Sequence, residues 1–374
     1  MSAMQLYSPI IKGKLNDLKA IYRLTPVAQA NIKPLIEAMP LPAKNKGVDD
    51  HLKKLVNNIV KYVELEEIFV DFYGLTPHIK TQDGVDATLA GFRLLNEQGV
   101  PVTPTYGLER DDDLWEPLHT IVKTFGRGFC FRIDIDDLDD QAENTMSQII
   151  ERSAQLGLKP KNVDLLIDLR DLSGQDLAEL KEIVLDFLQF IPQGQAYRSI
   201  ILAGSSALKS VGEIPKDGVM EIVQNELRIW AEIQRDIPES LNLIYGDYGV
   251  VHPDFSERGY AKYMNAKIRY TCKGSISYYR GHGLLYPIKD YEQYHDLAEK
   301  VRVASNYMGQ EFSFGDQYIN DVANISVSPG APATWVLADM NHHLEYTVMQ
   351  MIDLAEKVRA VENVIELEEL FEAS

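Results

Sequence analysis

The sequence predicts an α/β fold, a closed (β/α)8 barrel of the TIM type. Three observations lead to this fold class: short apolar runs that end in a charged or small polar residue, an amphipathic helical segment after each run, and a repeat of roughly 35 residues that gives eight units. Parallel pairing requires crossover helices, and eight crossovers favour closure over an open doubly wound sheet, which is the alternative. The expected strands are 7–12, 32–37, 68–71, 100–105, 129–134, 163–168, 199–205 and 243–247.

The helical segments between these runs carry apolar residues at steps of three and four. Residues 15–22 follow the first strand in this way and predict a short helix, and residues 177–187 follow the sixth strand. Turn residues separate the units, as at 171–174, where Ser173 can cap the helix that follows.

The strand–helix rhythm changes after residue 247. We expect a hairpin from strands 267–272 and 275–279, a helix around 291–308, and a long helix that begins near Asn341 and runs toward an acidic amphipathic tail ending at Ser374. No low-complexity linker separates this part from the rest. The prediction is a barrel over residues 1–260 and a C-terminal extension over residues 261–374 that is integral to the same domain.

The composition excludes several classes of partner. The 374 residues include 56 acidic and 37 basic side chains, a formal charge of −19, which repels nucleic acid and anionic membranes in the absence of a Lys/Arg-rich run. No stretch approaches the ~20 apolar residues of a membrane span, and the first residues do not form a secretory signal. Cys130 and Cys272 have neither zinc-ligand nor disulfide spacing. We therefore expect a cytoplasmic protein with reduced thiols.

Alternation along the fifth and sixth strands separates an apolar face from a charged one. The charged faces are Cys130, Arg132, Asp134, Asp136 and Asp164, Leu166, Asp168, Arg170. The wholly apolar faces should meet the surrounding helices, so the charged faces should point into the barrel. The same parity predicts a group of further side chains near the barrel mouth: Lys12, Lys14, Glu37, Thr103, Thr105 and Ser205, with Asp71 and Asp247 as companions.

Charges buried in a barrel must pair, bind a ligand or stay hydrated, because an unpaired buried charge costs several kcal/mol. Two interpretations follow. One is an internal ion-pair network that fills the barrel. In the other, Lys12, Lys14, Arg132 and Arg170 hold an anionic ligand, while carboxylates act as acid, base or metal ligand.

Cofactor interpretations are less specific. Acidic strand ends such as Glu37, Asp134 and Asp168 are suitable ligands for a divalent cation, but the four basic groups offset that charge. Ser205 follows Gly204 in a turn that resembles a phosphate-binding turn, and a tight chain reversal explains the same residues. Lys12 as a Schiff-base lysine would need pyridoxal phosphate, which nothing beyond Ser205 and Ser206 supports.

Several common enzyme signatures are absent. The sequence contains no G-x-S-x-G elbow, P-loop or G-x-G-x-x-G, which argues against serine hydrolases, P-loop NTPases and dinucleotide enzymes. Cys130 lies early in its strand and is interpreted as a small buried side chain rather than a nucleophile.

The stretch 277–283 combines aromatic, cationic and titratable groups with two glycines. Tyr279, Arg280 and His282 are therefore candidates for ligand contact, and His282 for proton transfer; the alternative is a well-packed hairpin end. The sequence Asn341-His342-His343 either adds a second imidazole or caps a helix. The remaining histidines are expected at the surface: His51, His78, His119, His252 and His295.

Short motifs spread over most of the chain resemble the "beta protein" family of phages and bacterial mobile elements. They are Tyr7-Ser8-Pro9-Ile10-Ile11-Lys12-Gly13-Lys14 with Asp17 and Ala20, Pro34-Leu35-Ile36-Glu37, Tyr278-Tyr279-Arg280-Gly281, Phe312-Ser313-Phe314-Gly315-Asp316, Trp335 and Asn341-His342-His343. The resemblance implies a phage or antiviral-defence setting and brings no assigned reaction. It makes Lys14 the family's first-strand lysine, with Lys12 as a second candidate.

The leading functional hypothesis is a barrel enzyme or enzyme-like binder of a small anionic, phosphorylated or nucleotide-like ligand at the strand C-termini. Lys14, Arg132, Arg170 and Arg280 would contact the anion, and Glu37, Asp134 and Asp168 would supply acid–base chemistry or metal ligation. The alternative is a non-catalytic interaction protein whose acidic surface, including the tail 358–371, binds a protein partner. A sugar-processing barrel is a third interpretation, which needs two acids about 5 or 9 Å apart.

Overall fold

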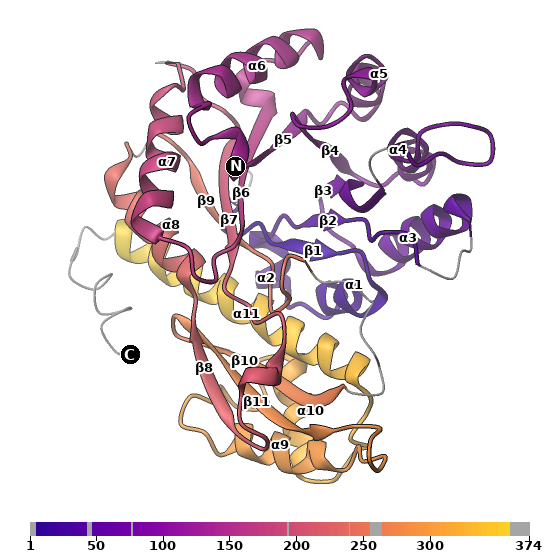
Figure 1. The fold of residues 1–374 in the computed structure, drawn as a ribbon, viewed down its shortest axis with the longest axis vertical. Coiled ribbons are helices and arrows are strands. Elements are labelled where there is room, and N and C mark those ends of the chain that lie inside the picture. Colours follow the sequence, from indigo (N-terminus) through magenta and orange to yellow (C-terminus); the bar gives the residue numbers. More distant parts are fainter. Residues whose placement is uncertain are drawn as a thin grey trace.

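The computed structural model describes residues 5–42, 47–75, 78–192, 194–238, 240–254 and 264–359, and the side chains of all these except 357–359. Two bodies of unequal size are joined by one long helix (Figure 1). The predicted tail 358–371 lies almost entirely outside the described residues. Among the described helices, none has both the length and the apolar character to cross a membrane.

The larger body is the expected barrel of eight parallel strands, hydrogen-bonded in the order β1-β2-β3-β4-β5-β6-β7-β9. Tyr7 bridges both Ile32 and Tyr245, and Ser8 N donates to Tyr245 O at 2.9 Å, which closes the ring. The predicted closed (β/α)8 fold is confirmed, and the open doubly wound alternative is wrong. The strands are β1 (Ile10–Lys12), β2 (Leu35–Glu37), β3 (Ile68–Asp71), β4 (Val102–Gly107), β5 (Phe129–Asp134), β6 (Val163–Asp171), β7 (Ser199–Ser205) and β9 (Leu243–Asp247).

Amphipathic helices surround this sheet. They bury the apolar outer faces of the strands: Trp115 of α5, for example, packs on Phe129 and Phe131 with ring centroids 5.8 and 5.9 Å apart. The helices are α1 (Leu15–Tyr22), α2 (Pro26–Asn31), α3 (Val48–Tyr62), α4 (Ala87–Glu97), α5 (Trp115–Phe125), α6 (Ala142–Gln155), α7 (Leu177–Gln189) and α8 (Asn225–Asp236).

The barrel interior is layered. Its middle is an apolar plug that contains Leu35, Phe69, Cys130 and Leu166, one side chain from each of four strands. Cys130 is fully buried there, and burial raises the pKa of its thiol, so the structure agrees with a packing role.

An ionic layer closes the N-terminal end of the barrel. Asp164 accepts from Arg198 Nε at 3.0 Å and from Ser199 Oγ at 2.7 Å, and Lys33 Nζ lies 3.3 Å from Glu67 Oε1. Thr103 donates to Glu67 in this layer. Thr103 was expected near the mouth, and that expectation is wrong. Its side chain points inward, as the strand alternation predicted, but it lies at the N-terminal end of the barrel.

The smaller body is a three-stranded antiparallel sheet in the order β10-β11-β8. β10 (Asn265–Cys272) and β11 (Ser275–Gly283) form the predicted hairpin. β8 (Val219–Val223) comes from the connection between β7 and α8, so a segment inside residues 1–260 joins this sheet. α9 (Gln293–Arg302) and α10 (Phe314–Ala323) complete the body.

α11 (Pro332–Arg359) runs between the barrel and the small sheet (Figure 1). It begins nine residues before the expected start at Asn341, because Pro332 suits the first turn of a helix rather than ending one. His343 of α11 links the two bodies: its Nε2 lies 3.0 Å from Asp247 Oδ2 and its Nδ1 lies 2.8 Å from Thr271 Oγ1 of β10.

Candidate functional site

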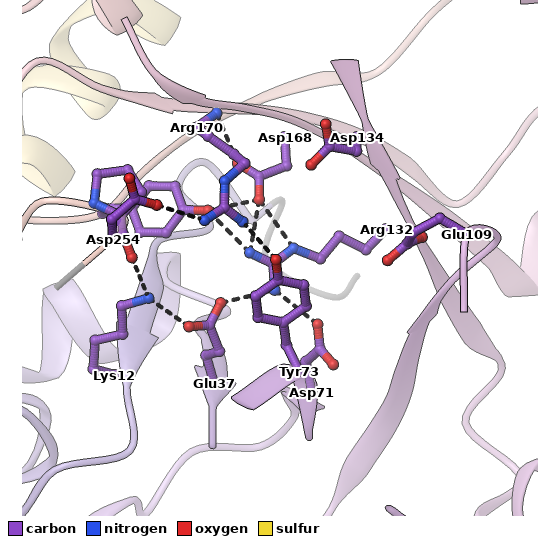
Figure 2. Close-up of polar contacts among 12 residues, drawn as sticks. Lys12, Glu37, Asp71, Tyr73, Glu109, Arg132, Asp134, Asp168, Arg170 and Asp254 are labelled. Carbon is purple, nitrogen blue, oxygen red and sulfur yellow. Dashed lines mark hydrogen bonds and ion pairs between the residues drawn. The ribbon is translucent and has the colours of Figure 1, made fainter. Parts of the chain in front are cut away.

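Five charged side chains meet at the C-terminal mouth of the barrel (Figure 2). Each comes from a different strand and all are nearly inaccessible to solvent, with exposed fractions of 6% or less. We call this group the mouth cluster: Lys12, Glu37, Asp71, Arg132 and Asp168. The alternation of the sequence placed these groups together because parallel strands end at one edge of the barrel.

Arg132 is the centre of the mouth cluster. Its Nη1 donates to Glu37 Oε2 and to Asp71 Oδ2, both at 2.8 Å, while Nε and Nη2 donate to Asp168 Oδ2 at 3.0 and 2.7 Å. Burial of the guanidinium opposes its charge, but the surrounding acidic groups raise its pKa well above the usual value. Arg132 therefore remains a fixed cation.

Tyr248 adds a phenol to this centre. Its hydroxyl donates to Asp168 Oδ2 at 2.6 Å and accepts from Arg132 Nη2 at 2.9 Å. Burial and the nearby Asp168 charge raise the pKa of Tyr248 well above its usual value, so the phenol keeps its proton.

Lys12 occupies the β1 side of the cluster. Its ammonium pairs with Glu37 and donates to the backbone oxygen of Pro253 at 2.9 Å, and it lies 5.2 Å from the centre of the Tyr248 ring. Lys14, the other predicted lysine, is the N-cap residue of α1 and is partly exposed. Of these two lysines, Lys12 is the one that joins the mouth cluster.

Arg110 is a further buried cation that the sequence did not reveal. It holds Asp71 in a bidentate pair, with Nη1 to Oδ1 at 2.6 Å and Nη2 to Oδ2 at 2.9 Å, and its Nε donates to Glu109 at 2.9 Å. Burial acts to raise the pKa of Asp71, but Arg110 and Arg132 outweigh it, and the pKa is lowered. Asp71 is thus a permanent carboxylate.

Three guanidinium groups surround the half-exposed ring of Tyr73. Those of Arg110, Arg132 and Arg170 lie 5.0, 4.9 and 5.4 Å from the ring centre. An aromatic ring at this distance attracts a cation. Tyr73 therefore holds three like charges close together at the rim of the mouth.

Arg170 is a partly accessible cation of the mouth. A register shift between Asp168 and Asp171 and a φ of 53° at Arg170 turn the chain at the end of β6. Arg170 Nη2 donates to Asp254 Oδ1 at 2.9 Å and Nη1 to Tyr73 Oη at 3.3 Å, and its side chain is 24% exposed. Asp254 also lies 3.6 Å from Lys209 Nζ, so one half-exposed carboxylate sits between two cations.

Asp134 lies beside the mouth cluster without a hydrogen bond to it (Figure 2). It caps the short helix Ile135–Asp137 that follows β5. Burial, together with the negative charge of Asp168, raises the pKa of Asp134, and burial raises the pKa of Asp137 to about 6. Burial therefore favours the protonated form of Asp134.

Four other predicted side chains make contacts outside the mouth cluster. Ser205 Oγ accepts from Ala207 N at 3.1 Å, so it caps its own turn. Tyr279, Arg280 and His282 lie on β11 in the small sheet: Arg280 donates to the carbonyl of Gly212, and His282 lies between Asp217 and Asp290. The structure thus does not bring these β11 residues to the mouth. A hairpin motif carries no information about which strand ends it will face.

Asp247 was expected at the mouth, and that expectation is wrong. Ile244 of β9 and Tyr248 directly after it point inward, whereas Asp247 faces outward and accepts from Tyr7 Oη at 2.6 Å, beside His343. His252, expected at the surface, is buried with Nε2 3.0 Å from Asp171 Oδ2.

The loop that follows β9 is the main feature missed by the sequence reasoning. Residues 248–254, the β9 loop, contact Arg132 and Asp168 through Tyr248, Lys12 through the Pro253 carbonyl, and Arg170 through Asp254. The available signal was the position of Tyr248, His252 and Asp254 directly after the last barrel strand, where loop residues border the mouth.

The mouth carboxylates are engaged by cations. Within the described ranges, no group of three or more potential ligands is arranged to hold a metal ion. Glu37, Asp71 and Asp168 each accept from Arg132 instead. Their chemistry in this structure is that of ion-pair partners.

Comparison with known proteins identifies a family. The family model described as Beta protein matches residues 7–349. No curated protein matches the sequence.

Three solved structures are similar at low identity. Octameric ribulose-1,5-bisphosphate carboxylase/oxygenase from Pyrococcus horikoshii OT3 is 13% identical with a TM-score of 0.36, over 68% of this chain and 56% of that one. Fructose-bisphosphate aldolase from Plasmodium falciparum is 10% identical with a TM-score of 0.29, over 65% and 67%. Alanine racemase from Clostridium difficile 630 is 13% identical with a TM-score of 0.32, over 73% and 61%. The chain spans little more than half of the first of these proteins.

Proposed function

Since the chain belongs to the Beta protein family, and its barrel mouth carries a preorganised group of cations, we propose that it binds a small anionic ligand at the C-terminal ends of the strands. The ligand is phosphorylated or nucleotide-like. Arg170 and Lys209 contact the ligand, which replaces Asp254 as their partner. The mouth cluster lies beneath these two cations.

The position of Asp254 carries this proposal. Its carboxylate lies between Arg170 and Lys209, at 2.9 and 3.6 Å, and is 48% exposed. An exposed ion pair contributes little to stability, so an incoming anion can replace Asp254 at small cost. The Arg170 guanidinium donates hydrogen bonds to Tyr73 and Asp254, whereas a guanidinium has five N–H donors. Donors therefore remain for a phosphate or carboxylate group.

The buried residues of the mouth contribute fixed charges to the site, and they keep their partners when a ligand binds. Arg132 and Arg110 are held by carboxylates, and Tyr73 lies between them and Arg170. Fixed charges of this kind stabilise an anion without reorganising. If the protein is an enzyme, Asp134 is the proton-transfer candidate, because burial raises its pKa and it lies at the rim.

The alternative function, a non-catalytic interaction protein, is supported by a different observation. Lys12, Glu37 and Asp168 already form ion pairs within the chain, so these charges have partners without any ligand. In that case the barrel is a scaffold and the acidic surface, with a formal charge of −19 for the chain, binds a basic protein. A cytoplasmic phage–host or antiviral role, implied by the family resemblance, is part of either proposal.

Titration calorimetry on the full chain tests anion binding, with AMP and inorganic phosphate as probes at low salt. Arg170→Ala should weaken binding at least tenfold, because it removes the charge and the fork of donors. Asp254→Asn should tighten binding several-fold, because it removes the competing carboxylate.

The Arg302–Glu299 pair on α9 provides matched controls. It has a similar separation, 2.7 Å, and similar exposure, but lies in the small body. Arg302→Ala and Glu299→Gln should leave the affinity for both probes unchanged. Absence of binding by the wild-type protein, or equal effects of the two arginine substitutions, contradicts the proposal and leaves the scaffold function.

A further inference from the structure

His252 is buried in the β9 loop and holds the backbone of Asp254, the last residue of that loop. Its Nδ1 accepts from Asp254 N at 3.0 Å, and its Nε2 lies 3.0 Å from Oδ2 of Asp171 at the end of β6. The Asp254 carboxylate in turn lies between Arg170 and Lys209. The imidazole therefore connects a barrel strand to the residue that competes with a ligand for these two cations.

These partners define which ring nitrogen of His252 carries a proton. A backbone N–H can only donate, so Nδ1, which faces Asp254 N, carries none. Burial acts to raise the pKa of Asp171, but hydrogen bonds from Ser173 outweigh it, and the pKa is lowered. Asp171 is therefore an ionised carboxylate that can only accept, so Nε2 carries the ring proton. In this structure His252 is a neutral ring with one donor and one acceptor in use.

A second proton on His252 breaks the contact with Asp254. It has to bind at Nδ1, where it points at the N–H of Asp254, and two donors cannot form a hydrogen bond. The contact between Nε2 and Asp171 instead becomes an ion pair, because the ring is then positively charged. Imidazole is the side chain that gains a proton on mild acidification, between about pH 8 and pH 5.

The charged groups around this contact keep their charge over the same range of pH. The hydrogen bond from Arg170 lowers the pKa of Asp254, so its carboxylate stays ionised. The guanidinium of Arg170 is always protonated. Lys209, with its Nζ 3.6 Å from Asp254, is a largely exposed ammonium. Acidification therefore removes the backbone contact of Asp254 without removing the charge of its side chain.

We propose that His252 is a pH switch for the barrel mouth: on acidification its ring gains a proton and releases the Asp254 backbone, so that the Asp254 carboxylate leaves Arg170. This proposal rests on the proposed function, because it concerns the access of an anion to Arg170. Lys12 still holds the carbonyl of Pro253, so the change is confined to the end of the β9 loop. The affinity for an anion rises as pH falls.

Calorimetry with sulfate at about pH 8 and about pH 5.5 tests the effect on binding. Sulfate keeps both of its charges over this range, whereas a phosphate monoester gains a proton at about pH 6. Wild-type protein should bind sulfate about fivefold more tightly at the lower pH, because the competing carboxylate has left. Burial raises the pKa of Asp134, and that of Asp137 to about 6, so a smaller increase in affinity comes from these two acids and remains in every variant.

Two substitutions isolate the switch. His252→Asn places an amide oxygen near the position of Nδ1, so it keeps an acceptor for Asp254 N that cannot be protonated, and it should lose most of the pH dependence. Asp254→Asn should lose it as well, because no carboxylate competes at either pH; this residue is half-exposed, so the variant folds even if His252→Asn does not. His282→Asn is the control and should behave as wild type, since His282 lies in the small body between Asp217 and Asp290.

Hydrogen exchange measured by NMR follows the switch without any ligand. After correction for the intrinsic rate, the protection of the Asp254 amide should fall on acidification in wild type and stay constant in His252→Asn. Constant protection in wild type overturns the proposal, and so does an equal pH dependence of sulfate binding in wild type and both variants. If protection falls but sulfate binds at neither pH, the switch is retained and the proposed function is rejected. If sulfate binds with the same affinity at both pH values, the proposed function is retained and the switch is rejected.

Discussion

Tyr248 donates to Asp168 at 2.6 Å, and the two side chains share Arg132 as a common partner. Asp168 ends the inward row of β6, whereas Tyr248 follows β9, two strands away around the barrel. The relationship therefore joins the β9 loop to the centre of the mouth cluster. It also means that one hydroxyl group satisfies both a buried carboxylate and a buried guanidinium.

Tyr248→Phe keeps the shape of the ring and removes this hydroxyl. We expect the free energy of unfolding to fall by about 1–3 kcal/mol, because Asp168 and Arg132 each lose a buried partner. Urea denaturation measures the change. Tyr22→Phe is the control, since Tyr22 is 45% exposed, and it should change stability by less than about 0.5 kcal/mol. Equal effects of the two substitutions would show that the hydroxyl is energetically unimportant.

Arg132→Met removes the central cation and leaves the carboxylates of Glu37, Asp71 and Asp168 buried. We expect a loss of about 3–5 kcal/mol at neutral pH. In the wild type the pKa of Asp71 is lowered, so its contribution is present above its unfolded pKa and lost as pH falls. The difference between the two proteins should therefore shrink as pH falls below the unfolded pKa of about 3.8. A difference that stays constant with pH would mean that Arg132 acts through packing alone.

Glu226→Gln tests a buried acid on α8. Burial raises the pKa of Glu226 from 4.5 to about 7, and a hydrogen bond from Ser206 Oγ at 2.6 Å only partly offsets this. Since the folded pKa is the higher one, Glu226 stabilises the fold fully below about pH 4.5 and loses this contribution as pH rises through 7. The variant should be more stable than wild type at about pH 8, by up to about 3 kcal/mol. Parallel thermal-melting curves over this range would refute the raised pKa.

Gly249→Ala tests the path of the β9 loop. Gly249 has a φ of 60°, and an added Cβ would lie 2.5 Å from Met340 Sδ of α11. We expect a loss of about 1–2 kcal/mol from the backbone conformation alone, with a further cost because Met340 must move. Gly212→Ala is the control, because its φ is not in the left-handed region and its nearest atom would be 3.3 Å away. Circular dichroism during thermal unfolding measures both, and similar stabilities would mean that α11 accommodates the loop freely.

The barrel and its charged interior could be predicted because both depend on local periodicity. Arg132 and Asp168 lie on strands long enough to show two distinct faces, and parallel strands place such faces around one axis. The same reasoning placed Glu37 and Lys12 at the mouth. It failed for Thr103, which points inward at the opposite end, because alternation indicates a face and not a depth along the barrel.

Other parts of the site depend on contacts between segments distant in sequence. Tyr248, His252 and Asp254 lie in a loop without periodicity, and Arg110 follows β4 in a connection where many residue types are tolerated. Asp247 faces α11 because His343, 96 residues later, supplies its partner. The pairing of β8 with β11 likewise requires knowledge of a strand that appears 52 residues later in the chain, measured from Val223 to Ser275. No local pattern carries that information.

The position of the β9 loop has a consequence for biosynthesis. A nascent chain leaves the ribosome with strands β1 to β7 before residue 248 has been made, so Arg132 and Lys12 then lack partners that complete their surroundings. Arg269, which holds the loop through Val250, is made later still. The charged lining of the mouth can therefore be completed only when about two thirds of the polypeptide has been translated, and a shorter chain lacks the β9-loop contacts of Arg132 and Lys12.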